Sequence, residues 1–306
     1  MKEIYDIANA ESYRKGNNGR EKKMVDVYVA SAFGKNNKGG NRAGVVLDRP
    51  DLTSGQKMEI AKKMGYSETA FVSDSYMADF KLQYFTPTEE VPLCGHATIA
   101  AFSVLNLLNM LDKRDYTIET KAGIFAIQIK EDGLIFMEQN CPAYFDVLSQ
   151  DIFAGCIEKG VIDCGFPIQI VSTGLKDIML PVASAEHLEK LSPNFKRIAE
   201  LSKEKQVVGI HAFALIKESD ITAICRNFAP LYGIDEEAAT GTSSCALACY
   251  LFKYYEKRTQ YIFEQGYNIG EISRIVVNIS YHMDRIDSVY VGGYGYLLGK
   301  FAWNGV

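Results

Sequence analysis

Polar and apolar residues alternate over many short segments of this 306-residue chain, and a period of two predicts β-strands. The alternation begins near residue 25, after a polar and charged segment, 1–23, that we interpret as an N-terminal extension. Segment 139–164 shows no clear period and is predicted to be irregular or partly helical. The predicted strands are 25–33, 45–47, 66–72, 79–85, 116–120, 124–130, 134–138, 167–173, 178–182, 207–216, 221–228, 272–279, 288–291 and 294–301.

Five segments have the pattern of helices. The first has a capping box from Thr53 to Gln56 and ends at Gly65, a residue that favours a helix C-terminus. Two others are almost wholly apolar, and a helix that is apolar on all sides is buried. The predicted helices are 53–64, 95–111, 184–191, 194–203 and 241–257.

The two apolar helices follow the same local pattern. Phe85-Thr86-Pro87 precedes a helix that begins at Gly95, and Phe228-Ala229-Pro230 precedes a helix that begins at Gly241. The two glycines are separated by nearly half of the chain, which is too long for a solenoid repeat. We therefore predict a duplicated domain, with residues 24–145 and 146–306 as its two copies and with the C-terminal strand free to join the first copy.

Small residues at the start of a buried helix leave its first backbone N–H groups open. These donors, together with the positive end of the helix dipole, suit a carboxylate or another small anion. We predict a cleft between the two halves in which the two helix N-termini face each other and bind a small carboxylate substrate.

The two copies differ at three positions that are polar in the first copy, which indicates that the copies have different functions. Glu68 is expected to correspond to Ile210, Cys94 to Thr240 and His96 to Thr242. A symmetric binding scaffold has no need for a carboxylate on one side only, whereas a catalyst with one general base does. Glu68 is therefore the candidate base, although an ion-paired surface carboxylate and a packing role for His96 are the alternatives.

Composition narrows the classes of function. The net charge of −5 argues against nucleic acid as a partner, and no apolar run is long enough to span a membrane. Seven cysteines without framework spacing and the lack of a signal peptide predict a cytoplasmic protein. The four histidines are scattered, so no metal site is expected, and neither a phosphate-binding loop nor a dinucleotide motif is present.

These motifs resemble the PhzF-like family, which is named for an isomerase of phenazine biosynthesis. The resemblance extends over almost all of 25–301. Its motifs are the segment 41–46, SETAFV at 67–72, FTPTEEVPLCGHATIA at 85–100, STGL at 172–175, RNFAP at 226–230, EEAATGTSS at 236–244 and VYVGG at 289–293.

The resemblance implies an α+β fold of two pseudo-symmetric domains, each a mixed, barrel-like sheet around a central helix, as in diaminopimelate epimerase. It also implies an isomerase that moves a proton within one substrate molecule without a cofactor. Glu68 falls on the general base of the family. The substrate-binding positions fall on Gly95, His96, Glu237, Gly241 and Thr242.

Three positions depart from the family pattern, because Glu237 replaces Asp, Ala238 replaces Pro and Thr242 replaces Ser. The pocket shape therefore differs, and the substrate stays open, as does the oligomeric state, a homodimer included. Two other functions stay open as well. One is a non-catalytic binding protein of this fold, and the other is an amino-acid epimerase that uses Cys94.

Overall fold

The computed structural model describes residues 24–49, 51–158 and 160–304. The predicted extension, 1–23, lies outside the described residues. Eighteen strands in the described part are joined by hydrogen bonds into one network, with five α-helices and three short 3₁₀ segments. No helix of the described part is long and apolar enough to cross a membrane. The fold is mixed α/β and dominated by its sheet.

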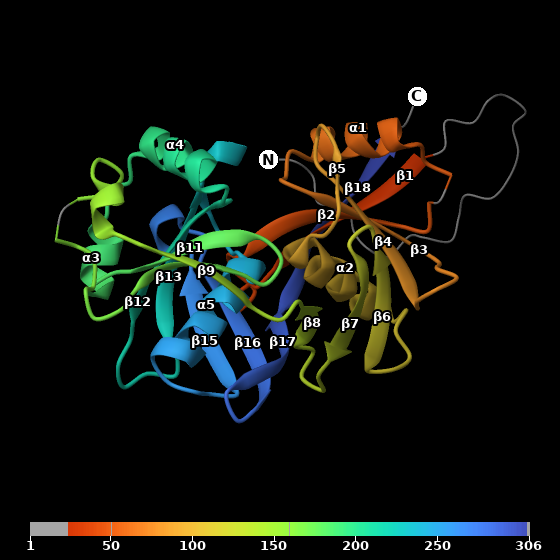
Figure 1. Ribbon diagram of the computed structural model, residues 1–306. Coiled ribbons are helices and arrows are strands. Elements are labelled where there is room, and N and C mark those ends of the chain that lie inside the picture. Colours follow the sequence, from red (N-terminus) through yellow and green to blue (C-terminus); the bar gives the residue numbers. More distant parts are fainter. Residues whose placement is uncertain (1–23, 50, 159, 305–306) are drawn as a thin grey trace, which may run out of the picture.

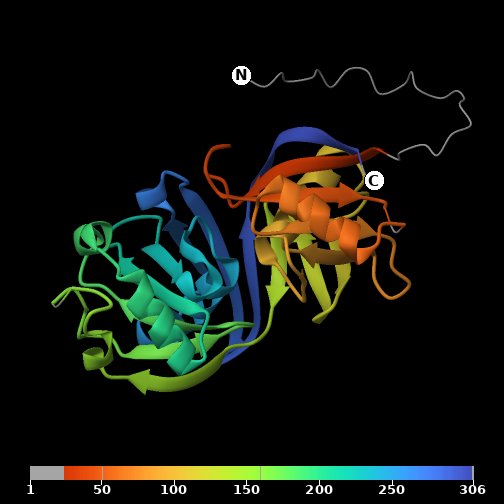
Figure 2. The ribbon, with the colours of Figure 1, turned by 90° about the horizontal axis from the view of Figure 1, so that it is seen from above.

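The ribbon forms two lobes that lie side by side (Figures 1 and 2). The first lobe contains the helices α1 (Ser54–Met64) and α2 (Gly95–Leu107). Its strands are β1 (Met24–Ala32), β2 (Asn41–Leu47), β3 (Thr69–Ser73), β4 (Phe80–Phe85), β5 (Glu90–Val91), β6 (Asp115–Thr120), β7 (Gly123–Ile129) and β8 (Ile135–Gln139).

The second lobe contains the helices α3 (Ala185–Lys190), α4 (Phe195–Lys205) and α5 (Gly241–Tyr254). Its 3₁₀ segments are η1 (Gln150–Phe153), η2 (Pro230–Tyr232) and η3 (Tyr267–Ile269). The strands that follow β8 are β9 (Ala143–Leu148), β10 (Ile168–Ser172), β11 (Lys176–Pro181), β12 (Gly209–Leu215), β13 (Ala223–Ala229), β14 (Ile234–Glu237), β15 (Gln260–Gln265), β16 (Ser273–His282), β17 (Arg285–Gly293) and β18 (Gly295–Asn304).

The central helices α2 and α5 carry the core. α2 packs against β1, β2, β8 and β18, while α5 packs against β10, β11, β16 and β17, and the two helices touch each other. Most side chains of both helices are buried, and one apolar cluster includes residues of both. The helices α1, α3 and α4 lie on the outside of the lobes (Figure 1). The prediction that both apolar segments are buried helices is confirmed, although they end at Leu107 and Tyr254, three or four residues early.

The strand pairing of the first lobe recurs in the second. β2 runs parallel to β3 as β11 runs parallel to β12, and β3 is antiparallel to β4 as β12 is to β13. In the same way β4 is parallel to β6, and β13 is parallel to β15. The two lobes are joined where β8 pairs with β17, and β18 returns to pair with β1 along the first lobe (Figure 2).

The register corrects one predicted correspondence. Thr69 pairs with Phe85 and Ile210 pairs with Phe228, so Thr69, not Glu68, is the counterpart of Ile210. The counterpart of Glu68 is therefore Gly209. A Cβ atom on Gly209 would lie 1.9 Å from the carbonyl oxygen of Phe228, so no side chain fits there. The predicted asymmetry between the copies remains, because the second lobe has no acid at this position.

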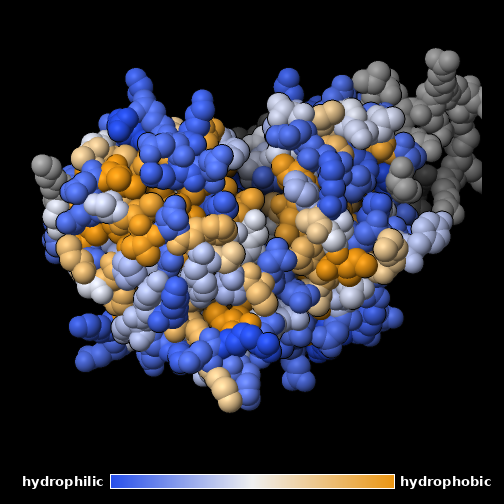
Figure 3. All heavy atoms as spheres, in the orientation of Figure 1, coloured by the Kyte–Doolittle hydropathy of each residue, from blue (hydrophilic) through white to orange (hydrophobic). Residues whose placement is uncertain are grey.

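The segment predicted as irregular contains β9, and three other strands, β5, β14 and β15, were not predicted at all. β9 leaves Phe145 and Val147 exposed, and Figure 3 shows apolar side chains gathered over this part of the second lobe. Because apolar residues stand at exposed positions of β9, its sequence lacks the alternation of apolar and polar residues from which strands are predicted. β9 is a strand because it pairs with β10, about twenty residues further along the chain.

Candidate active site

Both central helices begin without a side-chain cap. The N-cap residues, Cys94 of α2 and Thr240 of α5, accept no hydrogen bond from the first turn of their helices. The first N–H groups are therefore open to a ligand, and the helix dipole makes each N-terminus electropositive. A Cβ atom on Gly95 would meet nothing within 4 Å, so the N-terminus of α2 has open space beside it.

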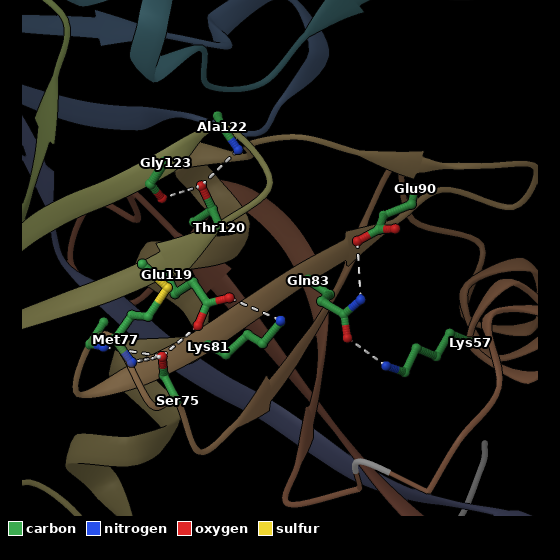
Figure 4. Close-up of polar contacts among 11 residues, drawn as sticks. Lys57, Ser75, Met77, Lys81, Gln83, Glu90, Glu119, Thr120, Ala122 and Gly123 are labelled. Atoms are coloured by element: carbon green, nitrogen blue, oxygen red, sulfur yellow. Dashed lines mark hydrogen bonds and ion pairs between the residues drawn. The ribbon is translucent and has the colours of Figure 1, made fainter.

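A chain of polar contacts fixes the segment that leads into α2 (Figure 4). The Lys57 ammonium of α1 donates to Gln83 Oε1 at 2.7 Å, and Gln83 Nε2 donates to Glu90 Oε1 at 3.1 Å. Lys57 is buried. Since lysine is seldom buried without a partner, its bond to Gln83 accounts for this position. The contacts tie α1, β4 and β5 together directly before the Cys94-Gly95-His96 segment, so they position the first helix N-terminus.

Glu68, His96 and Cys94 lie together at the N-terminus of α2. His96 Nε2 lies 3.3 Å from Glu68 Oε2, and His96 Nδ1 lies 3.4 Å from Cys94 Sγ. The Glu68 side chain is 19% exposed and the His96 side chain 8%, so both are largely shielded from water. The structure therefore brings the predicted base to the predicted helix N-terminus, rather than to the outer surface.

Burial sets the charge of the groups around Glu68. It lowers the pKa of His96, while the Glu68 carboxylate acts in the opposite sense, so the imidazole is neutral at pH 7. Burial also raises the pKa of the Cys94 thiol well above its usual value, and the charge of Glu68 adds to this rise. Cys94 is thus a thiol and not a thiolate, which makes it a poor base.

Glu237 lies at the end of β14 in the second lobe, and its carboxyl group accepts hydrogen bonds from one residue of each lobe. Asn41 Nδ2 donates to Glu237 Oε1 at 3.0 Å and to the Ala239 carbonyl at 3.0 Å. Thr240 Oγ1 donates to Glu237 Oε2 at 2.7 Å. Burial raises the pKa of Glu237 to about 7, and the charge of Glu68 adds to the rise, whereas the bonds from Thr240 and Asn41 oppose it. At neutral pH this carboxyl is therefore poised between its two protonation states.

Strand β2 makes hydrogen bonds to both Glu68 and Glu237. The main-chain oxygen of Glu68 accepts from the N–H of Gly44 in β2, and Asn41, which begins β2, binds Glu237. These anchor positions on β2 are separated by roughly 10 Å, since a strand rises by about 3.3 Å per residue. β2 therefore sets the spacing between a carboxylate of the first lobe and a carboxyl of the second.

The second helix N-terminus has a different environment. Thr173 Oγ1 donates to the Thr242 carbonyl at 3.0 Å, and Gly241 packs closely on Phe33 and Val291. Beneath it, Ser243 Oγ donates to the buried Asp177 carboxylate at 2.5 Å. Neither an acid nor a thiol lies at this N-terminus in the position that Glu68 and Cys94 occupy at the first.

Sequence reasoning missed Asn41 and Thr240, both of which bind Glu237. Asn41 belongs to the segment 41–46 that carries the family resemblance, and this membership was the sequence signal that could have identified it.

A surface cavity of about 890 Å³ lies elsewhere, between Cys141, Phe252 and Asp284, and none of the predicted site residues lines it.

Comparison with known proteins identifies the family of this chain. Residues 30–299 match the phenazine biosynthesis-like protein family, PhzC-PhzF. The chain is 35% identical over 272 residues to the uncharacterized isomerase YfhB of Bacillus subtilis, a match that covers 84% of this chain and 92% of the relative. It is 28% identical to the trans-2,3-dihydro-3-hydroxyanthranilate isomerase of Pseudomonas chlororaphis, with coverage of 90% and 98%.

Solved structures show the same fold. A Bacillus anthracis protein of the PhzF family superimposes with a TM-score of 0.84 at 32% identity, covering 92% of this chain and 99% of that one. A hydroxyproline epimerase from Agrobacterium vitis, with a TM-score of 0.57 and 11% identity over 92% and 91% of the two chains, shares the fold alone. With its matched family, its named relatives and its fold in agreement, this chain belongs to the phenazine biosynthesis-like (PhzC-PhzF) family and is an isomerase.

Proposed function

We propose that this isomerase moves a proton within a small carboxylate-bearing substrate, without a cofactor, and that Glu68 is its general base. The observation that carries the proposal is the position of the Glu68 carboxylate, largely shielded and 3.3 Å from the neutral His96, at the open N-terminus of α2. A carboxylate there can take a proton from carbon while the backbone donors hold the acid group of the substrate.

The two helix N-termini provide the binding energy for an anion. N–H groups at Gly95 and His96 on one side and at Gly241 and Thr242 on the other would receive the substrate carboxylate. Each dipole contributes about 0.3–1 kcal/mol, and up to about 2 kcal/mol where water is partly excluded. Together these terms orient a small acid without holding it tightly, which suits a substrate that must leave.

Glu237 completes the proton transfer. A carboxyl with a pKa of about 7 can donate a hydrogen bond when protonated and can accept a proton when ionised. In the proposed cycle, the Glu68 carboxylate removes a proton from one carbon, the electron pair of that bond shifts within the substrate, and another carbon receives a proton from Glu68 or from Glu237. Where Glu237 is the donor, Glu68 releases its proton and Glu237 regains one from solvent before the next turnover. The substrate keeps its atoms, so neither an oxidant nor a second reactant is required.

We also propose that the two lobes are pseudo-symmetric domains of the diaminopimelate epimerase type, with the site between them. The recurring strand pairing and the two central helices support this proposal, as does the bond between Asn41 of the first lobe and Glu237 of the second. Epimerisation by two thiols is disfavoured, because Thr240 stands where the second lobe would need a cysteine.

The proposal is tested by hydrogen exchange in D₂O. A panel of small amino and hydroxy acids, with trans-2,3-dihydro-3-hydroxyanthranilate included, is incubated with the protein, and deuterium at carbon is measured by mass spectrometry. We expect Glu68→Gln to lower the exchange rate by ~10²–10⁴, the usual effect of losing a general base. Glu131→Gln, a change at an exposed glutamate in the β7–β8 turn, is the matched control and should exchange as wild type does. A Glu68→Gln rate above about a tenth of wild type would place the base elsewhere, since the smallest expected loss is about 10².

A further inference from the structure

The cluster at the N-terminus of α2 contains three different metal-ligating groups. Glu68, Cys94 and His96 each offer one ligand atom, and these atoms lie within 4.8 Å of one another. His96 Nε2 is 3.3 Å from Glu68 Oε2 and 3.9 Å from Cys94 Sγ. The chain spacing of these residues did not predict a metal site, because Glu68 is far in sequence from the Cys-x-His pair.

The nitrogen–oxygen separation equals that of two ligands around one tetrahedral ion, the nitrogen–sulfur separation is slightly longer, and the oxygen–sulfur separation is within 4.8 Å. Bond lengths of ~2.0–2.1 Å for Zn–N and Zn–O and ~2.3 Å for Zn–S place the nitrogen about 3.3 Å from the oxygen and about 3.6 Å from the sulfur. Cys94 is the N-cap of α2 and His96 lies in its first turn, so one short backbone segment holds both of these ligands. Glu68 Oε2 is buried and makes no hydrogen bond of good geometry, so one lone-pair direction of the carboxylate is unused.

From this geometry we propose that Glu68, Cys94 and His96 bind one thiophilic divalent cation, with Zn²⁺ the best match, and that the bound ion blocks the general base. A thiolate, an imidazole nitrogen and a carboxylate oxygen form a donor set that Zn²⁺ accepts and that Mg²⁺ and Ca²⁺ do not, because hard cations select oxygen. Three protein ligands leave the fourth position open for water or for the substrate carboxylate.

Charge balance supports an ion with two positive charges. The neutral imidazole of His96 has a lone pair to donate, and the Cys94 thiol must lose its proton to become a ligand. Binding therefore converts Zn²⁺ and Cys94–SH into a Zn²⁺–thiolate and one released proton. The positive charge of the ion is then matched by the thiolate and by the Glu68 carboxylate, and no net charge is left buried.

The test is a titration with Co²⁺, which replaces Zn²⁺ and reports a thiolate ligand by a charge-transfer band in the near ultraviolet. The exposed cysteines, Cys141 and Cys164, are first replaced with Ser, so that surface thiols cannot give the signal. In this background we expect one Co²⁺ per chain, one proton released per ion, and loss of the band when Zn²⁺ is added. The proposal is overturned if no band forms, or if the band requires more than one ion per chain.

Two further variants locate the ligands. In the same background, Cys94→Ser should abolish the thiolate band, and Glu68→Gln should keep the band but weaken affinity by more than about 100-fold, since even an indirect contact to a metal ligand is worth 10–100-fold. A band that survives Cys94→Ser, or unchanged affinity in Glu68→Gln, contradicts the proposal. Circular dichroism is used to check that each variant is folded, and Glu68→Gln, which conserves shape, stays informative if Cys94→Ser does not fold.

The inhibitory consequence rests on the proposed function. Zn²⁺ should stop carbon-bound hydrogen exchange, with the same midpoint at which it displaces Co²⁺. If no acid in the panel undergoes exchange, the proposed function fails while the Co²⁺ titration still decides the metal site. If exchange occurs but Zn²⁺ binds without slowing it, the blocking role is wrong.

Discussion

The two helix N-termini have the same frame but different chemistry. Around the first, an acid, a thiol and an imidazole lie within contact distance. Around the second, the position that matches Glu68 is Gly209, whose neighbour Phe228 leaves no room for a side chain. A buried acid of the second lobe, Asp177, lies beneath α5 and bonds to Ser243 of that helix. This difference agrees with the proposed function, in which the first lobe supplies the general base and the second lobe, apart from Glu237, binds the substrate.

Gly209→Ala gives the largest expected change in stability. Its Cβ would lie 1.9 Å from the Phe228 carbonyl oxygen, so the backbone of β12 or β13 must move, and we expect about 3 kcal/mol or more of lost unfolding free energy. Urea denaturation measures the loss. Gly55→Ala, in a helix with open space around it, is the control and should be neutral or slightly stabilising. If Gly209→Ala is equally neutral, space does not explain why the second lobe lacks an acid.

Asp177→Asn should change how stability depends on pH. Burial raises the pKa of Asp177 to about 6, above its usual value of 3.8, so the folded protein binds more protons than the unfolded chain between these values. Wild-type stability therefore falls as pH rises from about 4 to above 6, by roughly 2–3 kcal/mol from this group. The neutral Asn lacks this loss, so the variant should gain about 2–3 kcal/mol relative to wild type between pH 4 and pH 8.

The measurement for Asp177 is denaturation at several pH values with both proteins. A difference between variant and wild type that is constant from pH 4 to pH 8 would show that Asp177 does not titrate in the folded state near pH 6. Exchange activity should change far less than in Glu68→Gln, because Asp177 supports the helix from below.

Gly95→Ala tests the first helix N-terminus directly. The added methyl group has open space, so stability should stay within about 0.5 kcal/mol of wild type. The methyl group would stand where the substrate carboxylate approaches the N–H groups, so we expect KM to rise about tenfold, equivalent to ~1.4 kcal/mol, with a smaller change in kcat. An unchanged KM would mean that the substrate is not anchored at α2.

Asn41→Ala should have the smallest effect and the most specific one. The bond from Asn41 favours the ionised form of Glu237 and so lowers its pKa. Without this bond the pKa of Glu237 should rise further, and the limb of the pH–rate profile that reports Glu237 should move to higher pH by about 0.5–1 unit, since one unit is worth ~1.4 kcal/mol. Asn106→Ala, at an exposed position of α2, is the control. A downward shift would contradict the proposed role.

Sequence patterns predicted the parts of this molecule that local chemistry determines. The capping box at Thr53 and the apolar helix that begins at Gly95 follow from neighbouring residues, and both are confirmed. The clustering of Glu68 with His96 was suggested by the motifs, but its distances come from the pairing of β2, β3 and β4, which joins distant segments.

The parts that sequence reasoning missed depend on contacts between the lobes or between distant strands. Asn41 binds Glu237 across almost two hundred positions of the chain, and no local pattern reports such a contact. The shift from Ile210 to Gly209 has a similar origin, because a repeat aligned by letters alone can slip by one residue. In a strand such a slip turns the side chain to the other face, so only the observed register could place the counterpart of Glu68.

The pairing of β18 with β1 has a consequence for biosynthesis. In the first lobe β1 pairs with β2 on one side, but its other edge has no partner strand until residues Gly295–Asn304 have left the ribosome. During translation the nascent chain therefore carries an open sheet edge, a recognised starting point for aggregation, until almost the last residues are made. Removal of β18 should consequently damage the lobe that is synthesised first, which is the lobe that contains Glu68, the proposed general base.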